Sequence, residues 1–190
     1  MRSERSPAGD DLPDKLAEVR FAALYRDNMR ELLGYALRRS TDPDDAADVV
    51  AETFLIAWRR LAEVPLGEKG RLWLYGTARH VLANKDRSAR RRDRLTERLR
   101  EELRHQLPGH QAHEFGAFVE ALASLAEPDR ELLMLIGWEE LTPTEAARAL
   151  GITPLAARTR LHRARRRLRA RLTEQRSEDS RKAEIEVEEA

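Results

Sequence analysis

The sequence contains no cysteine, no long apolar run and almost no net charge. The absence of cysteine excludes disulfides, a thiol redox switch and a cysteine-ligated zinc finger. A membrane-spanning helix needs an apolar run of about 18 residues or more, and the charged N-terminus lacks the apolar core of a signal peptide. We therefore expect a cytoplasmic protein with no membrane insertion.

The near-zero net charge hides strongly charged segments. The 35 Lys and Arg residues and the 34 Asp and Glu residues leave a formal charge of +1. Residues 42–52 contain five acids and no base, whereas residues 155–172 contain eight arginines and no acid. Residues 87–100 contain seven arginines against two acids. Two basic segments of about one helix each are typical of proteins that bind a polyanion such as nucleic acid.

The apolar spacing predicts an all-α fold. Strand signals are almost absent, and apolar residues recur at helical intervals along the chain, as in the candidate core face Leu74, Tyr75, Ala78, Val81 and Leu82. We expect two small helical domains joined by a flexible linker, the C-terminal one a helix-turn-helix domain. The predicted segments are a disordered N-terminus (1–14), a domain (15–94), a linker (95–113), a domain (114–172) and an acidic disordered tail (173–190).

Residues 141–172 carry the signals of a helix-turn-helix. Thr142 and Glu145, on either side of Pro143, form a capping box that starts a short helix. Gly151 can end that helix in the left-handed conformation, and Thr153 followed by proline starts the next helix at once. We expect this second helix to end near residue 172.

The first turns of this second helix are the predicted reader of duplex DNA. Arginine can bind guanine O6 and N7 in the major groove, a contact worth about 1–3 kcal/mol of discrimination. The predicted DNA-binding residues are Leu155, Ala156, Arg158, Thr159, Arg160, Arg163 and Arg165. The later arginines are better placed for phosphates, which position a protein without reading sequence; they are Arg163, Arg165, Arg166 and Arg167.

A polar stripe with one aromatic residue marks the helix expected to begin near residue 71. Unstacked bases need an aromatic plane to stack on and polar groups at their edges. The stripe, at steps of three and four, consists of Trp73, Thr77, His80, Asn84, Arg87 and Arg91. Surface residues beside a core tryptophan would give the same pattern, but the arginines that follow favour a nucleic-acid interface.

The helix expected before it carries an acidic face. Asp42 is a predicted N-cap before proline, and Asp45, Asp48 and Glu52 line one face at helical spacing. These carboxylates would repel DNA, so the face is either a solvated surface or a docking site for a basic protein.

Three segments together resemble bacterial sigma factors of the extracytoplasmic-function (ECF) group, which have only the region-2 and region-4 domains. Residues 45–59 (DAADVVAETFLIAWR) resemble the polymerase-binding helix of the group. Residues 73–84 (WLYGTARHVLAN) and onward to Arg87 resemble its minus-ten reading helix. Residues 141–153 (LTPTEAARALGIT) and 158–165 (RTRLHRAR) resemble its region-4 signature. The likeness spans residues 16–172.

The resemblance implies an alternative sigma factor that binds core RNA polymerase and recognises the minus-thirty-five and minus-ten promoter elements. Residues 64–72 and the helix that follows would capture a base flipped from the non-template strand. His80 stands where many members have asparagine. The implied partners are core RNA polymerase, promoter DNA and an anti-sigma factor, with no cofactor and no catalytic residue.

Three other functions are compatible with parts of the sequence. A helix-turn-helix transcriptional regulator could act without being a polymerase subunit, and a helical adaptor could bind an acidic protein through its arginines. A metalloenzyme would have to use His105, His110 and His113 with Glu114, which lie in or beside a segment broken by proline and glycine.

Overall fold

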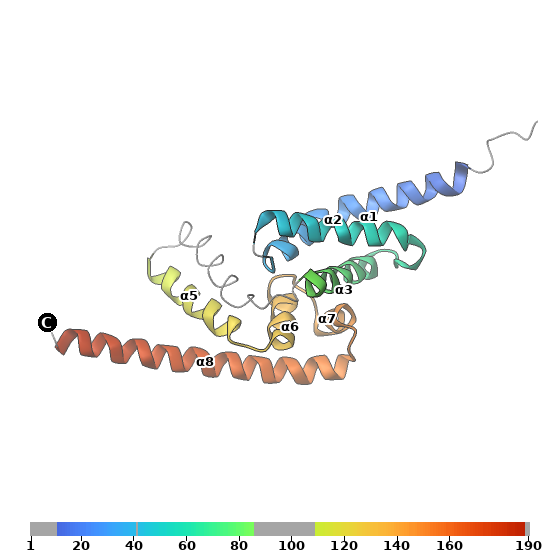
Figure 1. Ribbon diagram of the computed structural model, residues 1–190. Helices are drawn as coiled ribbons and strands as arrows, with labels where there is room; N and C mark the ends of the chain where they lie inside the picture. The colour runs from blue at the N-terminus through green and yellow to red at the C-terminus, as the bar shows by residue number, and fades with distance from the viewer. Residues whose placement is uncertain (1–10, 41, 86–108, 189–190) are drawn as a thin grey trace, which may run out of the picture.

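The computed structural model describes residues 11–40, 42–85 and 109–188, and all of its regular elements are helical (Figure 1). The N-terminal half comprises α1 (Asp11–Leu37), α2 (Pro43–Arg59), the short 3-10 helix η1 (Leu61–Glu63) and α3 (Glu68–Lys85). The C-terminal half comprises α5 (Gly109–Ala123), α6 (Glu127–Gly137), α7 (Pro143–Leu150) and α8 (Pro154–Glu188). The predicted all-α class is confirmed.

In the N-terminal half, α1 and α2 lie side by side and both pack on α3 (Figure 1). Asp42 caps α2 as predicted, because its side chain accepts a hydrogen bond from the Asp45 amide at 2.8 Å. All five predicted core residues of α3 are buried: Leu74, Tyr75, Ala78, Val81 and Leu82. Aromatic contacts complete the packing, with Phe21 of α1 against Trp58 of α2 at 5.1 Å between ring centroids.

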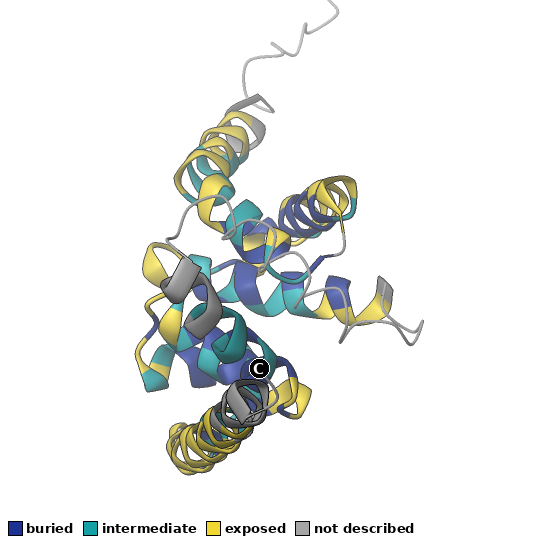
Figure 2. Cartoon of the chain, turned by 90° about the vertical axis from the view of Figure 1, so that its left-hand side faces the viewer, coloured by how far each residue is buried: buried dark blue, intermediate teal, exposed yellow. Residues whose placement is uncertain are grey.

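The two halves pack directly on each other, an arrangement that the sequence does not predict. One buried apolar cluster contains Leu74 and Tyr75 of α3 together with Leu132 of α6 and Ala149 of α7. Figure 2 shows that buried residues gather in the middle of the molecule, whereas the outer sides of the surrounding helices are exposed. The most extensive helix–helix contact across the boundary is that of α3 with α7. The C-terminal half thus covers one side of α3.

The ends of several helices differ from the prediction. The chain is helical from Asp11, inside the segment expected to be disordered, and α3 begins at Glu68 rather than near residue 71. α5 begins at Gly109, inside the expected linker, and the remaining linker residues up to 108 lie outside the described residues. The domain boundaries beyond these points stay predictions.

The largest difference is at the end of α8, which continues to Glu188 although its sequence was expected to be disordered beyond residue 172. Residues 173–188 contain no glycine or proline and are rich in Glu, Arg, Lys and Gln, which are good helix formers. Arg171 pairs with Glu174 at 3.2 Å along the helix, and Gln175 donates to Glu120 of α5 at 3.3 Å. High charge alone therefore does not stop this helix.

Candidate nucleic-acid interface

The predicted helix-turn-helix is built by the local signals in its sequence. The Thr142 hydroxyl accepts from the Glu145 amide at 3.3 Å, and the Glu145 carboxylate accepts from the Thr142 amide at 2.8 Å. Gly151 ends α7 at φ 65°, in the left-handed region. The Thr153 hydroxyl then accepts from the Ala156 amide at 3.2 Å, which caps α8. α7, turn and α8 follow the predicted order.

α8 packs through small and aliphatic side chains and exposes its predicted DNA-binding face. Ala157, Leu161 and Ala164 are buried against the rest of the C-terminal half. Arg160 is half-buried at the edge of that packed side. The other six predicted residues are exposed: Leu155, Ala156, Arg158, Thr159, Arg163 and Arg165. Leu155 is 71% exposed, so its side chain is accessible at the start of α8.

Arg167 has a structural contact in addition to its predicted role. Its guanidinium forms an ion pair with the buried carboxylate of Asp129 in α6. This ion pair holds the middle of α8 on α6, so Arg167 is less available for phosphate than the exposed Arg163, Arg165 and Arg166.

The predicted single-strand stripe lies along α3. Trp73 and Thr77 are half-buried, with the Thr77 hydroxyl donating to the Trp73 carbonyl at 2.9 Å, whereas His80 and Asn84 are exposed. Arg87 and Arg91, the remaining members of the stripe, lie outside the described residues. The four described side chains are thus on one helix as predicted.

A pocket surrounds part of this stripe and includes residues that sequence reasoning missed. Its cationic lining residues are Arg60, Lys69 and, from α7, Arg148, next to Trp73 and His80. The Arg60 guanidinium lies 6.0 Å from the centroid of the Trp73 ring, within the range of a cation–π contact. No spacing rule could find Arg148, because it reaches the pocket only through the packing of the two halves.

The acidic face of α2 is continuous with exposed apolar side chains. Asp48 and Glu52 are exposed and Asp45 is half-buried. Leu55 and Trp58, one and two turns further along, are 42% and 43% exposed. Exposed large apolar side chains beside charged ones are typical of protein-binding surfaces. Sequence reasoning found the carboxylates and missed the two apolar residues.

Comparison with known proteins identifies the family. Residues 24–92 match the family Sigma-70 region 2, and residues 115–168 match Sigma-70, region 4. RNA polymerase sigma factor YlaC of Bacillus subtilis is 30% identical over 166 residues, which cover 82% of this chain and 94% of YlaC. ECF RNA polymerase sigma factor SigL of Mycobacterium tuberculosis is 30% identical over 156 residues, which cover 80% of this chain and 88% of SigL.

The chain belongs to the ECF group of RNA polymerase sigma factors. It is therefore an alternative sigma factor that directs transcription, as the resemblance of its three segments implies. The fold is similar to that of the sigma factor RpoE in a solved complex with the anti-sigma factor NepR from Bartonella quintana. That comparison has a TM-score of 0.52 and 22% identity, and covers 86% of this chain and 97% of RpoE. We call α1–α3 the region-2 half and α5–α8 the region-4 half of this sigma factor.

Neither a membrane-spanning helix nor a metal-binding group is present among the residues that the structure describes. Residues 11–40, 42–85 and 109–188 contain no helix long and apolar enough to cross a bilayer. The same ranges contain no group of His, Asp and Glu side chains able to hold a metal ion. Of the candidate metal ligands, His105 lies outside the described residues, as do the side chains of His110, His113 and Glu114.

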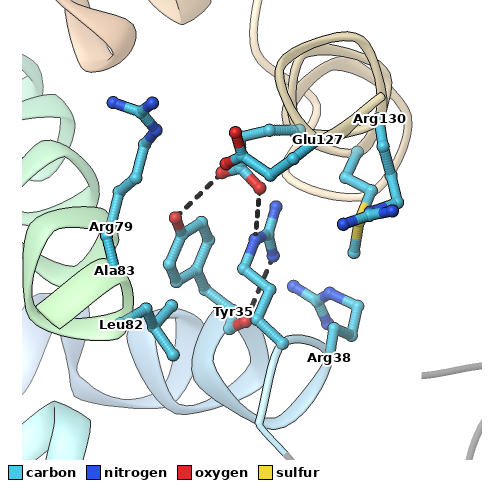
Figure 3. A pocket seen from close by; sticks show the side chains of 10 residues that line it. Tyr35, Arg38, Arg79, Leu82, Ala83, Glu127 and Arg130 are labelled. Carbon is cyan, nitrogen blue, oxygen red and sulfur yellow. Dashed lines mark hydrogen bonds and ion pairs between the residues drawn. The ribbon is translucent and has the colours of Figure 1, made fainter. Parts of the chain in front are cut away.

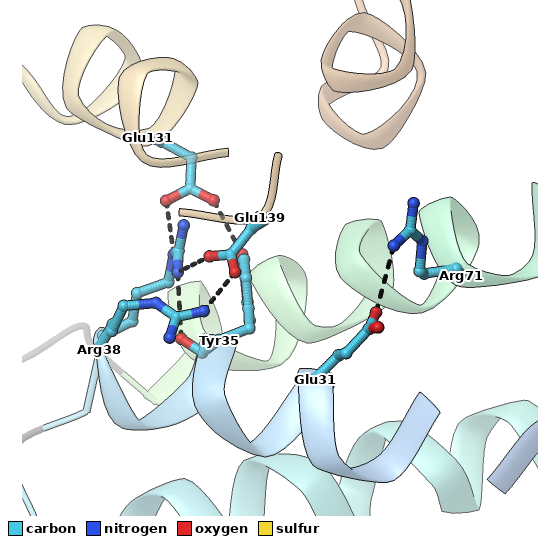
Figure 4. Close-up of polar contacts among 7 residues, drawn as sticks. Glu31, Tyr35, Arg38, Arg71, Glu131 and Glu139 are labelled. Carbon is cyan, nitrogen blue, oxygen red and sulfur yellow. Dashed lines mark hydrogen bonds and ion pairs between the residues drawn. The ribbon is translucent and has the colours of Figure 1, made fainter. Parts of the chain in front are cut away.

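A buried polar cluster joins the two halves of the sigma factor around Arg39 (Figure 4). Arg39 Nε donates to Glu131 of α6 at 2.8 Å, and Arg39 Nη1 donates to Glu139 at 2.9 Å. The Tyr35 hydroxyl also donates to Glu131, at 2.9 Å, and the Arg39 guanidinium lies 3.7 Å from the centroid of the Tyr35 ring. Arg38 forms a further ion pair with Glu139.

Burial and the neighbouring charges change the pKa values of two groups in this cluster. Burial raises the pKa of Glu131, but the Arg39 guanidinium and the hydrogen bonds from Arg39 and Tyr35 outweigh it and hold that pKa below its ordinary value. Burial raises the pKa of Tyr35 well above its ordinary value. At neutral pH the Glu131 carboxylate is therefore charged and the Tyr35 phenol is neutral. Removing one partner of such a buried pair costs about 3–5 kcal/mol, because the other charge is left without compensation.

Some buried hydrogen-bond donors in and beside this cluster have no partner. A pocket beside it is lined from both halves, with Arg79 of α3 facing Glu127 and Arg130 of α6 (Figure 3). Arg38 Nε, Arg39 Nη2 and Arg79 Nε are buried without a hydrogen-bond partner. An unpaired buried donor costs about 1–3 kcal/mol, which separation of the two halves would recover through hydration. The contact between the halves thus contains ion pairs that hold the halves together. It also contains buried donors without a partner, which water would hydrate if the halves separated.

Proposed function

We propose that this sigma factor brings core RNA polymerase to promoters through three separate surfaces. The acidic face of α2, with Asp45, Asp48 and Glu52, binds a basic surface of the polymerase. The first turns of α8 read the minus-thirty-five element in the major groove. The α3 stripe, with residues 64–72, captures a base flipped from the melted minus-ten element.

The observation that best supports this function is the exposure of six of the seven predicted DNA-binding residues on α8. The helix presents Arg158 and Thr159 at its start, where a major-groove helix makes its base contacts. Leu155 adds an apolar group that suits the methyl group of thymine. The exposed arginines further along are placed for phosphates.

An anti-sigma factor is the proposed regulatory partner. The solved relative RpoE is bound to the anti-sigma factor NepR. In this chain the exposed Leu55 and Trp58, beside the carboxylates of α2, offer an apolar and acidic surface of the kind such a protein could cover. An inhibitor bound there would compete with the polymerase for the same helix.

The direct test is run-off transcription with core RNA polymerase on a genomic promoter library, with and without the chain. We expect new initiation sites that depend on the chain and share two sequence elements. No new initiation on any template would contradict the proposal. Tight binding to duplex promoter DNA without polymerase, combined with no effect on initiation, would instead favour a helix-turn-helix regulator.

A further inference from the structure

A short loop, Val64 to Gly67, leads into the helix that is proposed to capture a flipped base. Val64 at its start is buried, whereas Leu66 is 74% exposed. Gly67 has φ 61°, in the left-handed region, and its carbonyl accepts a hydrogen bond from the Gly70 amide at 2.8 Å. A Cβ atom added to Gly70 would lie 2.6 Å from the Pro65 carbonyl oxygen, so the turn closes tightly. The loop therefore has one defined shape with an exposed tip.

A pocket of about 310 Å³ lies between this loop and α1. Its lining includes Leu24, Asp27 and Asn28 of α1 together with Leu66 and Gly67 of the loop. The volume is many times what one water molecule needs, so the tip of the loop is not packed closely against α1. The position of the loop relative to α1 thus depends on the contacts at its ends.

Arg20 of α1 reaches across to the start of the loop. Its guanidinium donates a hydrogen bond to the Val64 carbonyl, 44 positions further along the chain. The Arg20 side chain is half-buried and also lines the pocket. A hydrogen bond from a charged donor is stronger than one between neutral groups. Arg20 therefore ties α1 to the first residue of the loop.

The other end of the loop is held by ion pairs that are more exposed. Arg71 of α3 pairs with Glu31 of α1 at 3.3 Å (Figure 4) and with Glu68 at 3.1 Å. The Glu31 and Glu68 side chains are 51% and 79% exposed. Exposed ion pairs contribute little to stability, so they hold the start of α3 less firmly than Arg20 holds Val64.

The loop also forms part of the pocket around the α3 stripe. Pro65 lines that pocket together with Trp73 and His80, and it lines the pocket beside α1 as well. The Val64 carbonyl and the Pro65 nitrogen belong to one planar peptide group, and the proline ring fixes the next backbone angle. A shift of the Val64 carbonyl therefore moves Pro65 and changes the shape of the pocket beside the stripe.

We propose that Arg20 is a positioning residue for base selection at the minus-ten element. Its hydrogen bond to the Val64 carbonyl sets the position of residues 64–67, and through Pro65 the shape of the site that receives the flipped base. This inference rests on the proposed function of residues 64–72 and the α3 stripe. Arg20 acts through the loop and does not touch the base. Without its donor, the start of the loop moves into the pocket beside α1 and the site discriminates less between bases.

The first measurement follows the loop in the absence of DNA and polymerase. Hydrogen exchange of peptides that cover residues 64–72 is compared by mass spectrometry in the parent, Arg20→Met and Arg20→Lys. Methionine keeps a long unbranched side chain without a donor, whereas lysine keeps the charge and a donor. Exchange in this segment should be about five-fold faster in Arg20→Met, the ratio expected for the loss of one hydrogen bond, and intermediate in Arg20→Lys.

Peptides from α2 check that the fold is kept, because they should exchange at the parental rate in both variants. Parental exchange of residues 64–72 in Arg20→Met would overturn the proposal. Equal acceleration in Arg20→Met and Arg20→Lys would also overturn it, because the donor would then not be what holds the loop.

The second measurement tests base selection. Templates made from one promoter found in the run-off experiment carry each of the four bases at every minus-ten position. Single-round run-off transcription with core polymerase then gives, for each position, the ratio of transcript from the preferred base to transcript from the other three. Arg20→Met should lower this ratio about five-fold at one position and leave polymerase binding in a pull-down unchanged. Parental ratios, or an equal loss of transcript on all templates, would overturn the proposal.

The matched control is Arg26→Met, which removes one arginine from an exposed position of the same helix. Arg26 pairs with its neighbour Asp27 at 3.0 Å. This variant should keep the parental exchange and the parental ratios. If it relaxes base selection as much as Arg20→Met does, the loss of a positive charge is the cause and the proposal is wrong. Failure of the proposed function differs from both results, because the parent itself would then give no initiation.

Discussion

Arg39 and Glu131 lie 92 positions apart in the sequence, yet the Arg39 Nε atom is 2.8 Å from a Glu131 carboxylate oxygen. The pair joins the turn after α1, in the region-2 half, to α6 of the region-4 half, and both side chains are more than 90% buried. The pair therefore adds a direct polar contact between the two halves to the apolar cluster that they share.

Arg158→Ala should reduce transcription from promoters that depend on the minus-thirty-five element by about 5- to 150-fold, since one arginine contact to guanine contributes about 1–3 kcal/mol. Binding to core polymerase should be unchanged, because Arg158 is exposed on α8, far along the chain from the acidic face of α2. The measurements are run-off transcription and a polymerase pull-down. Arg171→Ala, which removes an arginine paired with Glu174 on the same helix, is the control and should have a smaller effect.

Asp48→Arg combined with Glu52→Arg should weaken binding to core polymerase at least ten-fold, because two attractive charges become repulsive against a basic partner. Both positions are exposed, so the helix content and the affinity of the region-4 half for duplex DNA should stay the same. Fluorescence anisotropy with labelled sigma factor measures the affinity. Glu18→Arg with Glu174→Arg introduces the same change of charge elsewhere; equal loss of binding in that variant would contradict a specific acidic face.

Local sequence signals predicted the helix-turn-helix well. The caps at Asp42 and Thr142 and the turn at Gly151 act over a few residues, so their chemistry determines the structure there without help from distant segments. The core face of α3 followed from periodicity for the same reason. The exposure of most predicted DNA-binding residues on α8 follows from the buried positions Ala157, Leu161 and Ala164 between them.

The contact between the halves could not be predicted in this way. Arg39 and Glu139 are charged residues that lie just after the ends of α1 and α6, and nothing in their local sequence indicates that they are buried together. Their pairing depends on how the two halves pack against each other, and local sequence patterns do not determine that packing. The continuation of α8 to Glu188 was not predicted for a different reason. The high charge density of the tail indicated disorder, but its residues are mostly good helix formers.

Gly151→Ala should destabilise the region-4 half by about 1 kcal/mol. Gly151 has φ 65°, where a Cβ atom is unfavourable, although no heavy atom lies within 4 Å of the position that this Cβ would take. The cost is therefore a backbone cost and not a clash. Urea unfolding followed by circular dichroism measures it. Gly151→Asn should cost less, since asparagine tolerates the left-handed conformation better; equal stability of Gly151→Ala and the parent would contradict the assigned turn.

The Arg39–Glu131 pair should make the stability of the sigma factor depend on pH in a way that Glu131→Gln removes. Glu131 faces Tyr35 of α1, Arg39 in the turn after α1 and the charge of Arg79 of α3. Its pKa in the folded chain is below the ordinary carboxyl value of 4.5. A carboxyl group with a lowered pKa stabilises the fold fully above its ordinary pKa, and this stabilisation is lost as pH falls through the folded pKa. Glu131→Gln should therefore be less stable than the parent at pH 7, by up to about 3–5 kcal/mol.

The difference between the two proteins should shrink as the pH is lowered below 4.5, because protonation of Glu131 removes one of the two charged partners of Arg39 in the parent as well. Urea unfolding at pH 7, 5 and 3.5 gives the free energy of unfolding of each protein. Glu174→Gln removes an exposed carboxylate whose pair with Arg171 contributes at most about 1 kcal/mol, so its difference from the parent should be small throughout. A Glu131→Gln difference that is the same at all three pH values would show that the lost hydrogen bonds, and not the charge of Glu131, account for the effect.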